Sequence, residues 1–137
     1  MPVYRTRSEE ETIALGRDLA RRLPRRAVVL LIGNLGAGKT TLAKGIVEGL
    51  GAAPADEVAS PTFTLVHEYG EGRVFHIDLY RIEDPAELRT LGIEDLLDRD
   101  AVLLVEWGER FPRLWPPDRI EIHLTPLDND DREILVK

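Results

Sequence analysis

Residues 27–32, Ala-Val-Val-Leu-Leu-Ile, form a continuous apolar run that a glycine-rich segment follows at once. A run of this length without alternation is typical of a strand buried on both faces, as in a parallel sheet with helices on each side. A helical segment then extends from about Lys39 to Leu50 and is closed by Gly51. A strand, a loop and a helix in this order predict an α/β fold.

The glycine-rich segment, residues 33–40, matches the phosphate-loop pattern G-x-x-x-x-G-K-[ST] in full. Glycines let the backbone curl so that successive N–H groups point at phosphate oxygens, and the following helix N-terminus adds its dipole. The Lys39 ammonium can bridge the outer phosphates of a nucleotide, and the Thr40 hydroxyl can ligate Mg²⁺. A chance glycine turn explains the full match and its context less well. The expected nucleotide-binding residues here are Asn34, Leu35, Gly36, Ala37, Gly38, Lys39, Thr40 and Thr41.

The rest of the chain continues this mixture of strands and helices. Ser8 and Glu11 form a capping-box pattern for a helix over about residues 9–23, and Asp84 is the expected N-cap of another helix. Strands are expected at residues 3–6, 64–69, 73–78, 101–105, 119–124 and 133–136. We therefore expect a single P-loop NTPase-like domain over residues 1–137, with a mixed, mainly parallel sheet flanked by helices.

Composition excludes several classes of function. The 137 residues include no cysteine, which removes disulfides, thiolate metal sites and cysteine nucleophiles. No apolar run approaches the roughly 18 residues of a membrane helix. The N-terminus has no apolar signal segment, so we expect a cytoplasmic protein without membrane contact. The net charge of −7 disfavours non-specific binding to nucleic acid.

Acids stand at the ends of two expected strands. Asp78 ends the strand at 73–78, and Glu106 directly follows the apolar strand at 101–105. Because ligands of parallel α/β sheets bind beyond the carboxyl ends of the strands, both acids are candidates for holding Mg²⁺ and for orienting water. With Lys39 they are the expected catalytic residues, and with Thr40 the expected metal ligands. The alternative for each acid is an ordinary surface charge at a strand end.

Further residues carry weaker signals. His76 shares a strand face with Asp78, and a structural or orienting role for it is favoured over metal binding. Thr62, in Ser-Pro-Thr at 60–62, stands where phosphate-loop switches sense the γ-phosphate, although an ordinary proline turn also explains this segment. Trp107 either stacks on the nucleotide or fills space in the core.

Several nucleotide-dependent activities compete. A small GTPase needs an N-K-x-D or T-K-x-D element, and none of the lysines, Lys39, Lys44 and Lys137, lies in one, which favours ATP. A small-molecule kinase stays open, with residues 81–99 as a conceivable lid. A nucleotide-gated binding module with negligible hydrolysis is a third alternative. No residue is an obvious arginine finger, so we expect weak hydrolysis by the chain alone. Arg81 is the nearest candidate, and a surface ion pair explains it equally well.

Four motifs, in this order and in a chain of this length, resemble the TsaE (YjeE) family of small bacterial ATPases. They are residues 33–41, S-P-T-F-T-L at 60–65, H-I-D-L-Y-R at 76–81 and V-E-W at 105–107. The phosphate loop alone is shared by many families, whereas the four motifs together are specific. Asn34 and Gly108 depart from the family's common Asp and Pro, at positions where neither side chain is expected to bind phosphate.

The resemblance implies a role in tRNA threonylcarbamoyladenosine (t⁶A) biosynthesis. Lys39 and Thr40 would hold ATP and Mg²⁺, Thr62 would belong to a switch segment, and Asp78 and Glu106 would be needed for hydrolysis. The family acts on the TsaB–TsaD complex, in which TsaD transfers a threonylcarbamoyl group to adenosine 37 of tRNA. By this resemblance the chain would hydrolyse ATP to let the complex turn over, and would meet tRNA only indirectly, through the complex.

Overall fold

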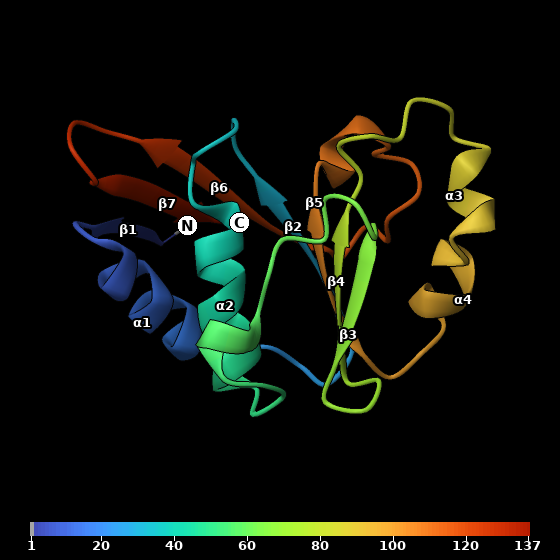
Figure 1. The fold of residues 1–137 in the computed structure, drawn as a ribbon, viewed down its shortest axis with the longest axis horizontal. Helices are drawn as coiled ribbons and strands as arrows, with labels where there is room; N and C mark the ends of the chain where they lie inside the picture. Colours follow the sequence, from blue (N-terminus) through green and yellow to red (C-terminus); the bar gives the residue numbers. More distant parts are fainter. Residues whose placement is uncertain (1) are drawn as a thin grey trace.

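The computed structural model describes residues 2–137, which fold around one sheet of seven strands (Figure 1). The strands are β1 (Val3–Thr6), β2 (Ala27–Ile32), β3 (Val66–Tyr69), β4 (Val74–Asp78), β5 (Val102–Glu106), β6 (Ile120–Pro126) and β7 (Arg132–Val136). They lie in the order β1-β7-β6-β2-β5-β4-β3. The central strands β6, β2, β5 and β4 are parallel, whereas β1, β7 and β3 are joined by antiparallel pairing. The predicted α/β class and mixed sheet are confirmed, with the parallel strands at its centre.

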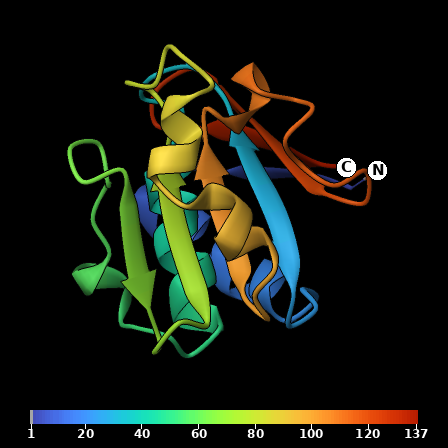
Figure 2. The same cartoon turned by 90° about the vertical axis from the view of Figure 1, so that its right-hand side faces the viewer.

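Helices cover both faces of the sheet (Figures 1 and 2). The helices and 3₁₀ turns are α1 (Glu9–Ala20), α2 (Lys39–Gly49), η1 (Ala55–Glu57), α3 (Glu87–Thr90), α4 (Ile93–Leu97) and η2 (Gly108–Arg110). α1 and α2 share one hydrophobic core with Val29 and Leu31 of β2. α3 and α4 share a second core, on the other face, with Val28 and Leu30. β2 is therefore apolar without alternation because both of its faces are buried.

The first helix begins as predicted and ends early. The Ser8 hydroxyl accepts a hydrogen bond from the Glu11 backbone N–H, and the Glu11 carboxylate accepts one from the N–H of Arg7. α1 ends at Ala20 rather than near Leu23, because the last N–H groups donate to carbonyls three residues back and so form a tighter turn.

Residues 81–99 cover the core and do not form a lid. Asp84 accepts a hydrogen bond from the Ala86 N–H, but the helix that follows, α3, has only 4 residues and begins at Glu87. Leu88, Ile93 and Leu96 of this segment are buried in the core beneath α3 and α4. No helix within residues 2–137 is long and apolar enough to cross a membrane.

The parallel centre of the sheet positions the site. β2, β4 and β5 run in the same direction, so the phosphate loop after Ile32 and the acids that end β4 and β5 meet at one edge. Asp78 and Glu106 are direct neighbours in the pairing of β4 with β5. The carboxylates predicted from strand-end position thus lie side by side.

Candidate functional site

A cavity of about 400 Å³ opens at this edge of the sheet. Its walls come from the start of α1, the phosphate loop, the segment at 60–62, the ends of β4 and β5, and the β6–β7 hairpin. The lining residues are Ser8, Glu9, Thr12, Leu35, Gly36, Gly38, Lys39, Thr40, Thr41, Ser60, Thr62, Asp78, Tyr80, Glu106, Trp107, Asp130 and Arg132. Segments that are far apart in the sequence therefore share one pocket.

The phosphate loop has the backbone shape that its glycines allow. Gly36 and Gly38 have φ values of 79° and 98°, in the left-handed region that side chains disfavour. Gly38 immediately precedes α2, so the first N–H groups of that helix lie beside the cavity. The Arg132 guanidinium donates a hydrogen bond to the Gly36 carbonyl over 3.2 Å and ties the loop to β7.

Lys39 is buried beneath the cavity, with 5% of its surface exposed. Its ammonium donates to the Gly33 carbonyl over 2.7 Å and lies 3.6 Å from the centre of the Trp107 ring. Burial lowers the pKa of Lys39, while the nearby carboxylates of Glu106, Glu109 and Asp78 oppose that shift. Trp107 reaches this position because its backbone turns into the left-handed region directly after β5, at a φ of 65°.

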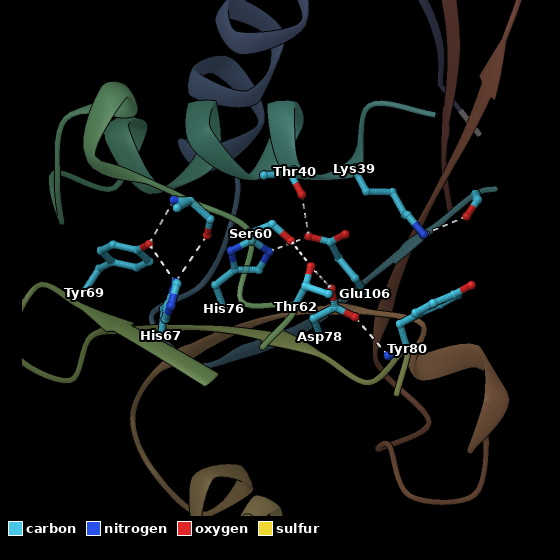
Figure 3. Close-up of polar contacts among 12 residues, drawn as sticks. Lys39, Thr40, Ser60, Thr62, His67, Tyr69, His76, Asp78, Tyr80 and Glu106 are labelled. Carbon is cyan, nitrogen blue, oxygen red and sulfur yellow. Dashed lines mark hydrogen bonds and ion pairs between the residues drawn. The ribbon is translucent and has the colours of Figure 1, made fainter. Parts of the chain in front are cut away.

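The two acids are buried, each with 4% of its surface exposed, and each is held by hydrogen bonds (Figure 3). Glu106 Oε2 accepts a bond from the Thr40 hydroxyl over 3.0 Å and lies 2.6 Å from His76 Nε2. Asp78 Oδ2 accepts a bond from the Thr62 hydroxyl over 3.3 Å, and Oδ1 accepts one from the Tyr80 N–H over 2.9 Å. These acids are therefore not ordinary surface charges.

The segment at 60–62 bridges the acids and the outer strand of the sheet. The hydroxyls of Ser60 and Thr62 lie 2.7 Å apart, and Thr62 in turn contacts Asp78 (Figure 3). Just before this segment, the carbonyl and N–H of Ala59 contact His67 and Tyr69 of β3. A series of polar contacts thus connects β3 with the cavity by way of the Ser60 and Thr62 hydroxyls.

Most of the expected site residues lie together. The cavity is lined by ten of them: Leu35, Gly36, Gly38, Lys39, Thr40, Thr41, Thr62, Asp78, Glu106 and Trp107. Asn34 is exposed and Ala37 is fully buried, and neither lines it. The Ala37 N–H already donates to the Asn34 carbonyl within the loop.

Sequence reasoning missed several residues of the cavity. Tyr80 stacks at a tilt against Trp107, with ring centres 5.1 Å apart, and its place two residues after Asp78 was a usable signal. Asp130 and Arg132 come from the β6–β7 hairpin, and Ser8 from the start of α1. No local pattern distinguishes Asp130 and Arg132 from other surface polar residues, and the capping pattern of Ser8 marks a helix start and not a cavity. Arg81, the candidate arginine finger, lies over the Phe63 ring at 4.6 Å.

The donor set fits a magnesium ion that is bound together with phosphate. Within the described residues no group of three or more His, Cys, Asp or Glu side chains could hold a metal by itself. Mg²⁺ typically takes one or two carboxylates and completes its shell with phosphate and water oxygens. The hydroxyl of Thr40 beside the buried carboxylates of Glu106 and Asp78 is a set of this kind.

Comparison with known proteins gives the family. The family model described as "Threonylcarbamoyl adenosine biosynthesis protein TsaE" matches residues 6–134. The chain belongs to the TsaE family. A relative in Bacillus subtilis, named as a tRNA threonylcarbamoyladenosine biosynthesis protein TsaE, is 40% identical over 133 residues, which are 96% of this chain and 82% of the relative. A TsaE of Treponema pallidum is 36% identical and is covered over 96% of both chains.

A solved structure agrees with this family. The crystal structure of Bacillus subtilis YdiB superimposes with a TM-score of 0.77 at 33% identity, over 97% of this chain and 82% of YdiB. The resemblance inferred from the four sequence motifs is therefore confirmed, and the TsaE fold is the fold described above.

Proposed function

We propose that this TsaE-family protein binds and hydrolyses ATP in tRNA t⁶A biosynthesis, as a cytoplasmic protein that acts on the TsaB–TsaD complex. The observation that carries the proposal is the convergence of Lys39, Thr40, Asp78 and Glu106 on one cavity behind a complete phosphate loop. The family supports the pathway, since its members are named for t⁶A biosynthesis.

The phosphate loop would hold the triphosphate. Backbone N–H groups at the start of α2 and the Lys39 ammonium face the same space, where the outer phosphates would lie. Mg²⁺, when bound, would neutralise charge that develops on the phosphate oxygens. Thr40 and Glu106, already in contact with each other, would hold the ion, with Asp78 next to them.

Asp78 would also link hydrolysis to the switch segment. Its carboxylate contacts Thr62, whereas Glu106 contacts Thr40 at the start of α2. Glu106 is already engaged with Thr40 beside the loop that would hold the phosphates, so Asp78 is the acid left to orient an attacking water together with Thr62. We therefore assign the orientation of this water to Asp78 and the metal contact principally to Glu106.

The kinase alternative is less well supported, because its candidate lid, residues 81–99, is part of the packed fold. Leu88, Ile93 and Leu96 of residues 81–99 are buried in the core, which anchors this segment against the sheet.

Nucleotide titration of the purified chain tests the proposal. We expect Mg²⁺-dependent binding of ATP in preference to GTP, slow release of phosphate, and loss of both in Lys39→Ala. The matched control is Lys44→Ala, which removes a lysine from the same helix outside the cavity lining. Binding of GTP as tight as ATP, or phosphate release that Lys39→Ala leaves unchanged, would contradict the assignment.

A further inference from the structure

A histidine that the nucleotide cannot touch lies directly behind the candidate metal site. His76, in the middle of β4, is fully buried. Its Nε2 lies 2.6 Å from Glu106 Oε2, and its Nδ1 has no hydrogen-bond partner in the described part of the chain. Figure 3 shows the ring beside the Glu106 carboxylate, with Thr40 approaching the same oxygen from another side.

The surroundings fix which ring nitrogen carries the proton. A neutral imidazole has one N–H donor and one bare acceptor nitrogen. A proton on Nδ1 would be a buried donor without an acceptor, which is costly, whereas a proton on Nε2 meets the Glu106 carboxylate. Nε2–H therefore donates to Glu106, and Nδ1 is left without a partner in the described part of the chain.

We propose that His76 is a positioning residue that fixes the carboxylate of Glu106 for metal and phosphate chemistry. Together with Thr40 it holds Oε2 from two directions and so restrains rotation of the carboxylate. Oε1 makes neither of these bonds and stays available to the cavity that Glu106 lines. This inference rests on the function proposed above and adds the residue that orients its metal ligand.

Packing alone does not explain a histidine at this place. His76 is paired with Leu104 of β5 and His67 of β3, and its ring contacts Glu106; a leucine would fill this space without burying a polar ring. Residues that hold a metal ligand from behind typically change metal affinity or activity by roughly 10- to 100-fold when they are replaced. A buried ring that only fills the core would not affect metal binding in this way.

The test replaces His76 with side chains that do or do not reach Glu106. The amide of His76→Gln can place an N–H near the position of Nε2, whereas His76→Asn is too short and His76→Leu has no donor. The readout is Mn²⁺ affinity in the presence of a non-hydrolysable ATP analogue, with nucleotide affinity in EDTA and melting temperature measured in parallel. His123→Gln, which changes a histidine outside the cavity lining, is the control.

We expect His76→Leu and His76→Asn to weaken Mn²⁺ binding by roughly 10- to 100-fold at unchanged nucleotide affinity in EDTA, and His76→Gln to restore most of it. If His76→Leu does not fold, the comparison of Gln with Asn decides. Mn²⁺ binding that is parental in the Asn variant, or equally weak in the Gln and Asn variants, would overturn the proposal.

Two further measurements separate this inference from the proposed function. Histidine ¹H–¹⁵N spectra of the nucleotide-free protein should show His76 protonated at Nε2, with a shift that Glu106→Gln changes. A proton on Nδ1, or a His76 signal that Glu106→Gln does not change, would refute the hydrogen bond between His76 and Glu106. If the parent lacks ATPase activity, the proposed function fails, yet the Mn²⁺ titration still decides the role of His76. In an active enzyme, His76→Leu added to Glu106→Gln should lower the rate no further.

Discussion

Lys39 occupies a resting position that a bound phosphate would disturb. Its ammonium donates to the Gly33 carbonyl and lies over the Trp107 ring, almost out of contact with solvent. Burial lowers the pKa of Lys39, which means that the charged ammonium is less stable here than in water. A phosphate oxygen is a stronger partner for an ammonium than a neutral carbonyl. Binding of a triphosphate should therefore draw the ammonium from the ring towards the phosphates.

Trp107 should report this movement. We expect its fluorescence to change when ATP is added, because the cation next to the indole ring changes position. Trp115 is the other tryptophan; it is buried and donates to the Gly108 carbonyl, and it does not line the cavity. In Trp107→Phe the remaining emission should be insensitive to ATP. A response that persists in Trp107→Phe would assign the signal to Trp115 and contradict the movement.

Asp78 and Glu106 should be needed for activity, while the repulsion between their charges should lower the stability of the folded protein. Two carboxylates are buried side by side on paired strands, and like charges in that position repel. Asp78→Asn and Glu106→Gln remove one charge each and keep the shape. We expect each variant to lower hydrolysis at least about tenfold, with a melting temperature at or above that of the parent. A variant that hydrolyses ATP at the parental rate would remove that acid from the mechanism.

At the scale of elements, small residues bring α1 against α2. A Cβ atom added to Gly45 would collide with the backbone carbonyl of Ile13, and one added to Gly16 would come within 2.6 Å of the Leu42 carbonyl. The glycines thus allow the two helix backbones to touch. Because α2 begins directly after the phosphate loop, this contact also fixes the position of that loop.

Gly45→Ala should therefore destabilise the protein. The added methyl group meets backbone rather than a flexible side chain, so the helices must separate, at a cost of about 3 kcal/mol. Urea unfolding at pH 7 measures the change, and Lys44→Ala, one position earlier on α2, is the control that should differ little. Equal stability of Gly45→Ala and the parent would show that the helix pair is not packed this tightly.

Glu48 ties the end of α2 to two other segments and gives a pH-dependent prediction. Two hydrogen bonds to its carboxylate lower the pKa of Glu48 below the usual 4.5. The larger effect comes from the Ala55 N–H and the smaller one from the Arg17 side chain. The unfolded chain therefore binds a proton here at a higher pH than the folded chain does. The stabilisation is present above about pH 4.5 and is lost as pH falls through the lower pKa of the folded state.

Replacing Glu48 with Gln should abolish this dependence. We expect Glu48→Gln to be less stable than the parent at pH 7, with a difference that shrinks steadily as unfolding is repeated at lower pH. Urea titrations of both proteins across the acid range provide the measurement. A difference that stays constant, or grows, towards acid pH would mean that the charge of Glu48 does not stabilise the folded state.

Sequence patterns predicted those elements whose apolar residues are required by burial on both faces. The unbroken apolar runs at 27–32 and 101–105 became central parallel strands, because both faces of each are covered. The capping residues marked where α1 begins, but α1 ended sooner than expected. The predicted N-cap Asp84 was wrong, because α3 begins at Glu87 with Ala86 as its N-cap. Local patterns locate a helix approximately, whereas its bounds depend on how the chain must turn between its neighbouring elements.

For the whole molecule, the limit of sequence reasoning lies in contacts between distant segments. The phosphate loop, Asp78 and Glu106 were predictable because motif and strand-end position carry the information locally. Arg132, from the last strand, meets the phosphate loop 96 residues earlier in the chain, and its neighbours in sequence give no sign of this. The pairing of β7 between β1 and β6 is what brings it there.

Exposed apolar side chains gather around the same site. Leu35 in the phosphate loop is 68% exposed, Phe63 beside the switch segment is 79% exposed, and Tyr80 after β4 is 44% exposed. Large apolar groups at the mouth of a polar cavity are typical of surfaces that another protein covers. The net charge of −7 disfavours tRNA as the direct occupant. A protein partner at this edge would touch both the phosphate loop and the segment that holds Thr62.

Such a partner should control the rate of hydrolysis. Arg81 lies over Phe63, and Arg132 in the cavity lining donates to the Gly36 carbonyl, so both arginines are already engaged. Phosphate-loop enzymes that lack an arginine finger gain roughly 10³–10⁵ in rate when a partner completes the site. We expect weak ATPase activity of the chain alone and clear stimulation by the TsaB–TsaD complex. In a reconstitution with the threonylcarbamoyl donor and tRNA, multiple turnovers should require this protein with Lys39 intact, and Lys44→Ala should support them. Product that accumulates beyond one equivalent per complex without the protein, or with Lys39→Ala in its place, would mean that ATP hydrolysis here does not drive turnover.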